Sequence, residues 1–168
     1  ELTEEIIKHF TGKSEIENMT WIKEQFDLPG TMEDLLEERR RPTDNIYTKK
    51  TNLMPGVERL LKKIRGAGIS QSIASGAPAH HIRLAAKRFG WYNYFDELIS
   101  TDHVNHIGKP DPGVYLHTAN IMGVKPERCV VFEDAENGIV SAKRAGMKCI
   151  AVPDKRWSFG DMSGADLL

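Results

Sequence analysis

Short apolar runs alternate with helical segments from residue 53 onwards, and this alternation limits the fold more than any other feature of the sequence. The segment 57–64 carries apolar residues at i, i+3, i+4 and i+7, which is the spacing of one face of a helix. Further helices are predicted over 78–89, 114–122 and 138–145. Each of these three is followed by a glycine, the residue that commonly ends a helix.

Apolar runs of strand length separate these helices, at 69–74, 95–100, 129–132 and 149–152. Strands that alternate with helices form βαβ units, in which the strands are parallel and the helices cover the sheet. We therefore predict an α/β fold with a Rossmann-like parallel sheet as its core.

The first 50 residues show no convincing strand pattern and are predicted to be helical. Pro42 interrupts the last helical stretch, and residues 46–50 are expected to continue the helical layer. These observations divide the chain into a small helical domain, 1–52, and an α/β core, 53–168. Residues that favour the N-cap position precede the helical stretches: Thr3, Ser14 and Thr31.

Composition excludes several classes of function. The chain is 40% hydrophobic and 28% charged with a net charge of -1, so it lacks the basic excess of a nucleic-acid-binding protein. No apolar run approaches the ~20 residues of a membrane helix, and no signal-peptide pattern is present. Cys129 and Cys149 each open an apolar run and are predicted to be buried free thiols. We expect a cytoplasmic protein with no membrane or nucleic-acid partner, while the oligomeric state is left open.

Two adjacent carboxylates, Glu133 and Asp134, end the apolar run at 129–132 and directly precede a helix. In an open α/β sheet, ligands bind outside the carboxyl ends of the strands. Two carboxylates at such a place need a cation, and oxygen ligands suit Mg²⁺. The alternative is that Asp134 merely caps the following helix.

Two other polar segments are predicted at the same sheet edge. Ser75, Gly76 and Ala77 follow a strand, and a hydroxyl with backbone N–H groups at a helix start can bind phosphate oxygens. Lys109 lies between a glycine and a proline in a loop. The plainer alternatives are a simple turn and an exposed lysine. Together, however, a cation, a lysine and amide or hydroxyl donors are what stabilise a phosphoryl group in transfer.

At these residues the sequence resembles the haloacid dehalogenase superfamily. Ser75 after a strand, the segment 108–112 (Gly-Lys-Pro-Asp-Pro) and the segment 131–138 (Val-Phe-Glu-Asp-Ala-Glu-Asn-Gly) resemble its second, third and fourth motifs, in that order. The segments 54–57 and 145–147 are similar to the subgroup of β-phosphoglucomutase and the small sugar-phosphate and pseudouridine-phosphate phosphatases. The helical domain then corresponds to that subgroup's cap domain.

The resemblance implies a role for each matching residue. Ser75 would hydrogen-bond the phosphoryl oxygens, and Lys109 would neutralise the phosphoryl group and the nucleophile. Asp134, with Glu133, would hold Mg²⁺. Residues expected near the leaving group are Gly12, Lys13, Gly76 and Ala77.

One family motif is not in this sequence: the first, a strand ending in Asp-x-Asp that precedes the cap and carries the attacking aspartate. We expect that strand, the first of the core, upstream of residue 1. On this view the protein is a Mg²⁺-dependent phosphatase that acts through an aspartyl-phosphate. Its substrate is a small phosphorylated metabolite, either a sugar phosphate or a compound like a nucleoside monophosphate. The alternatives are a phosphomutase, and an inactive phosphate-binding or regulatory protein without a nucleophile.

Overall fold

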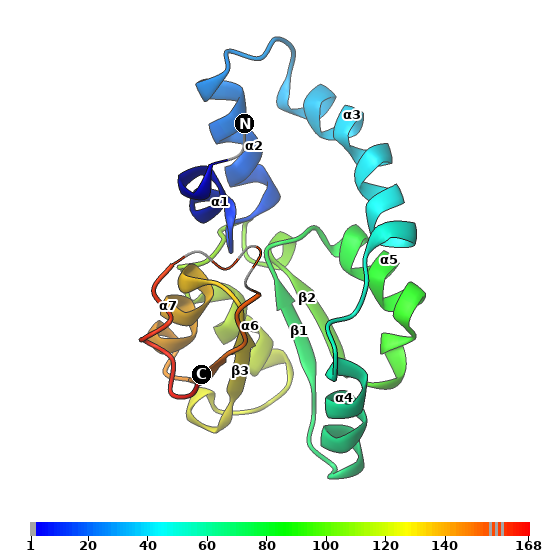
Figure 1. Ribbon diagram of the computed structural model, residues 1–168, viewed down its shortest axis with the longest axis vertical. Helices are drawn as coiled ribbons and strands as arrows, with labels where there is room; N and C mark the ends of the chain where they lie inside the picture. Colours follow the sequence, from blue (N-terminus) through cyan, green and yellow to red (C-terminus); the bar gives the residue numbers. More distant parts are fainter. Residues whose placement is uncertain (1–2, 155, 157, 159) are drawn as a thin grey trace.

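The computed structural model describes residues 3–154, 156, 158 and 160–168. A helical part, coloured blue to cyan, lies at one end of the molecule, and an α/β part fills the other (Figure 1). The helical part runs through α1 (Glu4–Phe10), α2 (Glu15–Gln25), α3 (Met32–Asn45) and η1 (Ile46–Lys50), a single π-helical turn. The boundary at residue 52 stays a prediction.

All three predicted N-caps are confirmed. Thr3 accepts a hydrogen bond from the Ile6 backbone N–H at the start of α1. Ser14 and Thr31 each form a reciprocal capping box, with Glu17 and Asp34 respectively. These caps satisfy backbone N–H groups that have no partner inside the helix.

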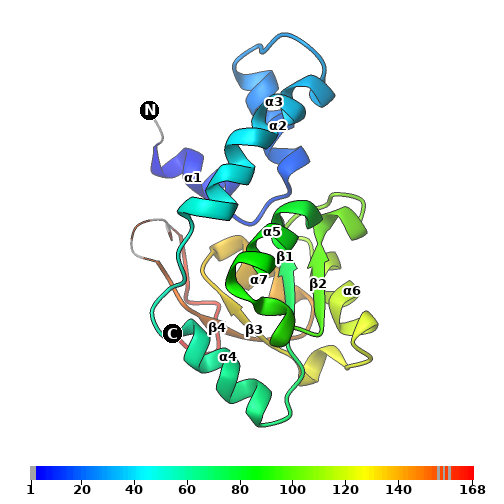
Figure 2. The same ribbon diagram turned by 90° about the vertical axis from the view of Figure 1, so that its right-hand side faces the viewer.

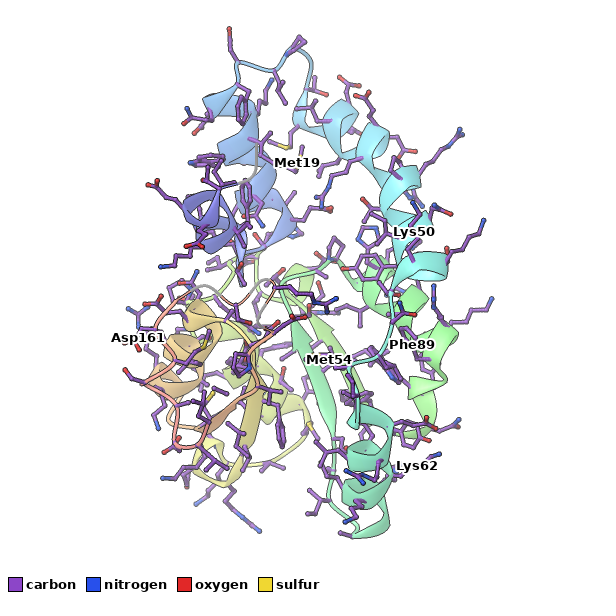
Figure 3. The ribbon with its side chains drawn as sticks, in the orientation of Figure 1. Met19, Lys50, Met54, Lys62, Phe89 and Asp161 are labelled. Carbon is purple, nitrogen blue, oxygen red and sulfur yellow. The ribbon has the colours of Figure 1, made fainter. Side chains whose placement is uncertain are left out.

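Helices α2 and α3 pack against each other but bury few side chains. Met19 is the buried residue of α2, on the side that faces α3 (Figure 3). The expected interruption at Pro42 is wrong, because α3 continues through Pro42 to Asn45. A proline in a helix loses one backbone hydrogen bond. The next residues nevertheless stay helical, since α3 leads directly into η1, which packs on the core helix α5.

The α/β part contains the predicted alternation of helices and strands. Its helices are α4 (Val57–Gly66), α5 (Ala79–Phe89), α6 (Gly113–Ile121) and α7 (Glu136–Arg144). Its strands are β1 (Ser72–Ser75), β2 (Glu97–Ser100), β3 (Val130–Glu133) and β4 (Lys148–Ala151). Short 3₁₀ turns complete it: η2 (Trp91–Asn93), η3 (Thr101–His103) and η4 (Pro126–Arg128).

The strands are parallel but form two separate pairs. Within β1–β2, Ser72 pairs with Glu97, and within β3–β4, Val130 pairs with Lys148. No ladder joins β1 to β3 among the described residues, so each keeps an unpaired edge. The strands of the two pairs lie side by side in both views (Figures 1 and 2). The predicted parallel α/β fold is confirmed, with its sheet divided.

Strand β1 begins later than the sequence indicates, at Ser72 instead of residue 69. Asp96 accepts a hydrogen bond from the Gln71 backbone N–H and pairs with Arg65, which holds residue 71 at the strand entrance. Ile69 lies before that point and is 57% exposed. An apolar residue in a run therefore need not belong to the strand.

The main core lies between the β3–β4 pair, α6 and α7, and includes Val131, Ile139 and Cys149. Cys149 is buried, whereas Cys129, also expected to be buried, is only half-buried. Helix α6 buries Val114 and Ala119 together with Tyr115, whereas its Leu116 is exposed. Among the described residues, no helix is long and apolar enough to cross a membrane.

Candidate functional site

A cavity of about 210 Å³ lies at the carboxyl ends of β1 and β3, below the helical part. It brings together all the residues that the sequence singled out for this site, although their roles stay predictions. The lining residues are Thr11, Gly12, Lys13, Ser75, Gly76, Ala77, Lys109, Glu133, Asp134 and Ala135.

Lys109 is buried at the base of the cavity, only 6% exposed, which is unusual for a lysine. Its ammonium group donates to the Ala74 carbonyl oxygen at 3.2 Å and to the Glu133 carboxylate. It also lies 4.6 Å from the centre of the Tyr115 ring. The lysine thus joins the end of β1 to the end of β3, and the alternative of an exposed loop lysine is wrong.

Both oxygens of the Glu133 carboxylate have hydrogen-bond partners within the protein. Its Oε1 accepts hydrogen bonds from Lys109 and, at 2.5 Å, from the Tyr115 hydroxyl, and its Oε2 accepts from the Asp134 backbone N–H. Burial alone would raise the pKa of Glu133, but the Lys109 charge and these hydrogen bonds outweigh it and lower the pKa. Gly138 in α7 packs directly on this carboxylate, where a Cβ atom would overlap it. The structure therefore gives the Glu133 carboxylate partners within the protein, with Lys109 as its ion-pair partner.

Asp134, by contrast, opens into the cavity, and no ion pair joins it to a lysine or arginine within the described chain. Partial desolvation and the adjacent Glu133 charge raise the pKa of Asp134. The N-cap residue of α7 is Ala135, without a side-chain cap, so the interpretation of Asp134 as a plain helix cap is wrong. Of the two carboxylates, Asp134 is therefore the one without an ion pair among the described residues.

Hydrogen bonds from β2 and η3 hold the turn at 75–77. Ser75 Oγ accepts a hydrogen bond from the Ala77 backbone N–H at 3.1 Å. The Ala77 carbonyl oxygen accepts from the Ser100 hydroxyl at 2.7 Å, and the Gly76 carbonyl oxygen accepts from Thr101 at 3.2 Å. Because both carbonyl groups are tied down, the turn presents a fixed set of groups to the cavity.

The loop between α1 and α2 closes the cavity from the helical side. The Gly12 carbonyl oxygen accepts a hydrogen bond from the Lys109 backbone N–H at 3.0 Å, and the Thr11 carbonyl oxygen accepts from Asn137 Nδ2 at 2.9 Å. Gly12 has a φ of 88°, a left-handed conformation that glycine adopts without strain. Lys13 Nζ lies 3.2 Å from a ring nitrogen of His9, which places a cation of the helical part at the rim.

A second contact joins this loop to the core through Glu17. Glu17 Oε2 completes the capping box with Ser14 and also accepts a hydrogen bond from the Gly108 backbone N–H at 2.9 Å. The approach is close enough to require glycine in the core. A Cβ at Gly108 would overlap the Ser14 backbone, and one at Gly76 would overlap the Lys13 carbonyl oxygen.

Sequence reasoning missed several residues that complete this arrangement: Tyr115, Asn137, Glu17, Ser100 and Thr101. The signal for Tyr115 is chemical, because a tyrosine on a core helix needs a partner for its hydroxyl. The signal for Glu17 is its place three residues after Ser14, which predicts the capping box. The contact between Glu17 and Gly108, 91 residues apart, has no local signal.

The chain is similar in sequence to proteins that are named as phosphatases. A "Probable pseudouridine-5'-phosphatase" from Drosophila melanogaster is 34% identical over 140 residues, 80% of this chain and 60% of that protein. A phosphorylated carbohydrates phosphatase from Thermotoga maritima is 28% identical over 148 residues, 88% of this chain and 68% of that protein. The chain thus spans about 60% of the length of the first curated relatives that it matches.

Solved structures agree on the fold. CbbY from Rhodobacter sphaeroides, solved in complex with phosphate, superposes with a TM-score of 0.81 at 26% identity, covering 98% of this chain and 75% of that one. β-Phosphoglucomutase from Clostridium difficile gives a TM-score of 0.84 at 22% identity over 99% of this chain and 75% of that one, a likeness of fold alone.

The family assignment rests on a match over most of the chain. The model of the haloacid dehalogenase-like hydrolases matches residues 1–146, which include every residue of the cavity. The motif order, the parallel α/β fold and the convergence of the three strand-end segments on one cavity agree with that match. The chain belongs to the haloacid dehalogenase-like hydrolase family.

Proposed function

We propose that the protein is a Mg²⁺-dependent phosphatase that hydrolyses a small phosphorylated metabolite through an aspartyl-phosphate. The observation that carries the proposal is the composition of the cavity. A buried lysine, an anchored Ser75–Ala77 turn and a carboxylate without a protein cation converge on about 210 Å³. That volume suits a phosphoryl group and the adjoining part of a small molecule. The lysine, the donors of the turn and a cation held by the carboxylate would offset its negative charge.

The donor set at Asp134 fits Mg²⁺. Mg²⁺ is commonly held by one or two carboxylates together with waters and substrate phosphate oxygens. Asp134 offers an oxygen to the cavity, and partial desolvation together with the adjacent Glu133 charge raises its pKa. When bound, Mg²⁺ would supply positive charge at the phosphoryl oxygens. Glu133 would support the site by holding Lys109, and its own role as a ligand stays a prediction.

We place the nucleophile on a strand upstream of residue 1. The divided sheet supports this proposal, since β1 and β3 each keep an unpaired edge while Lys109 connects their carboxyl ends. Val130 and Phe132 on β3 are 55% and 47% exposed, so this strand leaves apolar surface uncovered beside its unpaired edge. A strand between β1 and β3 would pair both edges and deliver its last residue to the cavity.

In the proposed reaction, that aspartate attacks phosphorus and the ester P–O bond breaks. The released alcohol takes a proton, and water then hydrolyses the acyl phosphate. Lys109 stabilises the charge on the phosphoryl oxygens and on the carboxylate, while Ser75 and the Ala77 turn orient those oxygens. The names of the relatives, which include pseudouridine-phosphate and carbohydrate-phosphate phosphatases, support a phosphorylated metabolite as substrate.

The upstream strand is tested by the intact mass and sequence of the protein isolated from its source. We expect a mass well above 18.9 kDa and an Asp-x-Asp sequence upstream of residue 1. A protein of 18.9 kDa without that motif would contradict the enzyme and favour a phosphate-binding role. A panel of phosphorylated metabolites, assayed for free phosphate and for an isomeric product, then separates the phosphatase from a phosphomutase.

Replacing Lys109 with alanine should reduce hydrolysis of p-nitrophenyl phosphate by the full-length protein at least about 10²-fold. The reason is that the cavity loses its buried cation. Circular dichroism should verify that the variant is folded, because Glu133 loses its partner. The exposed lysine of another loop provides a matched control, and Lys125→Ala should retain wild-type turnover. Wild-type activity in Lys109→Ala would remove Lys109 from the mechanism.

Replacing Asp134 with asparagine should shift the Mg²⁺ titration of the same activity to at least about tenfold higher concentration, since the ligand loses its charge. Asp27→Asn, at an exposed position of the helical part, is the control and should leave the titration unchanged. An unaltered Mg²⁺ dependence in Asp134→Asn would exclude Asp134 as a ligand.

A further inference from the structure

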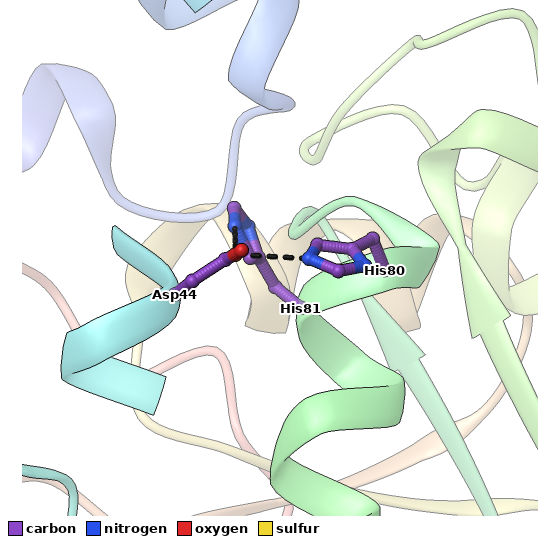
Figure 4. A group of neighbouring side chains, drawn as sticks. All are labelled: Asp44, His80 and His81. Carbon is purple, nitrogen blue, oxygen red and sulfur yellow. Dashed lines mark hydrogen bonds and ion pairs between the residues drawn. The ribbon is translucent and has the colours of Figure 1, made fainter. Parts of the chain in front are cut away.

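A group of three potential metal ligands lies away from the cavity, where the helical part meets the core. Asp44 is near the end of α3, and His80 and His81 are in the first turn of α5. Figure 4 shows the carboxylate of Asp44 pointing toward both imidazole rings. Among the described residues, this is the one group of three histidine, cysteine or carboxylate side chains whose ligand atoms lie within 4.8 Å of one another.

The distances match the spacing of ligands around a tetrahedral transition-metal ion. Asp44 Oδ1 lies 2.9 Å from His80 Nε2 and 3.2 Å from His81 Nε2, and all three ligand atoms lie within 4.8 Å of one another. A tetrahedral ion with bonds of about 2.0 Å has ligand–ligand edges of about 3.3 Å. Two edges are therefore near their bound length, and the third is at most 4.8 Å.

His81 provides an independent sign that the group binds a ligand. Its side chain is 94% buried (6% exposed), and its Nε2 atom, which faces Asp44, has no hydrogen-bond partner of acceptable geometry. A buried polar atom without a partner is costly. Tyr47 stacks on the ring at 4.8 Å with an interplanar angle of 4°, which fixes the direction of Nε2.

We propose that Asp44, His80 and His81 form a binding site for a transition-metal ion of the Zn²⁺ type, which links helix α3 to helix α5. Two imidazole nitrogens and a carboxylate oxygen are typical ligands for Zn²⁺, with a fourth position left to water. Asp44 and His80 are 32% and 39% exposed, so the open side of the site faces solvent.

The site is chemically distinct from the proposed Mg²⁺ site. Mg²⁺ prefers oxygen ligands, whereas imidazole selects for Zn²⁺ and its neighbours in the transition series. The ion would tie the end of α3 to the core immediately before the chain crosses back into the α/β part. It would therefore stabilise one arrangement of the helical part on the core, whether or not the cavity is catalytic.

The experiment is a calorimetric titration of EDTA-treated, dialysed protein with ZnCl₂, and with MgCl₂ for contrast. We expect saturable binding of one Zn²⁺ per chain, and for Co²⁺ the visible absorption of a tetrahedral complex. Asp44→Asn and His80→Ala should each weaken Zn²⁺ binding at least about tenfold. Both positions are partly exposed, so the variants should fold, which circular dichroism verifies.

His106 offers a matched control, because it forms a similar histidine–carboxylate pair with Asp102, at 3.3 Å, without a second imidazole. His106→Gln should bind Zn²⁺ like the wild type. Zn²⁺ should also raise the Tm of the wild type and of Lys109→Ala but not of Asp44→Asn, which separates this site from the cavity. The proposal fails if no saturable binding occurs, or if Asp44→Asn and His80→Ala bind as tightly as His106→Gln.

Discussion

The helical part contacts the core in two regions that differ in kind. At the cavity, each hydrogen bond has a backbone atom on at least one side. The carbonyl oxygens of Gly12 and Thr11 accept from the core, and the backbone N–H of Gly108 donates to Glu17. At the junction of α3 and α5, side chains make the contacts, through Asp44 and the stacked pair of Tyr47 and His81.

This difference decides which residues each region tolerates. Backbone-to-backbone contact requires that no side chain stands between the two segments, which makes Gly76 and Gly108 specific requirements of closure. At α3 and α5 the contacts run through side chains, so the backbones of the two helices need not approach each other closely. We infer that the cavity region sets how tightly the site is closed, whereas the α3–α5 region holds the helical part in place.

Among the substitutions that test this difference, Gly108→Ala is expected to increase amide exchange at Lys109 the most. The added Cβ would overlap the Ser14 backbone, and overpacking of this kind typically costs about 1–3 kcal/mol. Amide hydrogen exchange at Lys109, which donates to Gly12, should therefore accelerate by about tenfold or more. Gly66→Ala is the control, because nothing lies within 4 Å of its Cβ. Unchanged exchange in Gly108→Ala would show that closure does not depend on this approach.

A smaller effect is expected from Glu17→Ala, and the second capping box makes an internal control. Glu17 and Asp34 cap their helices in the same way, but only Glu17 also accepts a hydrogen bond from the core. Both alanine variants should lose about 1 kcal/mol of stability. Only Glu17→Ala should accelerate exchange of the Gly108 amide. Equal exchange in the two variants would mean that the contact between Glu17 and Gly108 contributes nothing to closure.

The smallest effect is expected from Asn137→Ala, which removes one hydrogen bond to the Thr11 carbonyl oxygen. A neutral hydrogen bond contributes about 1 kcal/mol, so exchange at Lys109 should rise only about fivefold. Asn120, exposed on α6, gives the matched control Asn120→Ala. If amide exchange at Lys109 is faster in Asn137→Ala than in Gly108→Ala, the close backbone approach at Gly108 is not what limits closure.

Much of this fold follows from local patterns in the sequence. The caps Thr3, Ser14 and Thr31 were predictable because an N-cap interacts with residues two or three positions away. Strand β1 was displaced because its start depends on Asp96, 25 residues beyond Gln71. The burial of Tyr115, which the sequence did not single out, likewise depends on Glu133 in another element. The errors fall where a distant residue decides the outcome.

For the site, the sequence alone determined which residues lie at strand ends and therefore that Ser75, Lys109 and Asp134 share one edge of a parallel sheet. Only the tertiary structure decided that Glu133 pairs with Lys109 and Tyr115, which leaves Asp134 without an ion pair among the described residues. The physical reason is the separation along the sequence between the residues that interact. Strand ends and caps follow from neighbours in the chain, whereas the partner of a buried charge is set by whichever element packs against it.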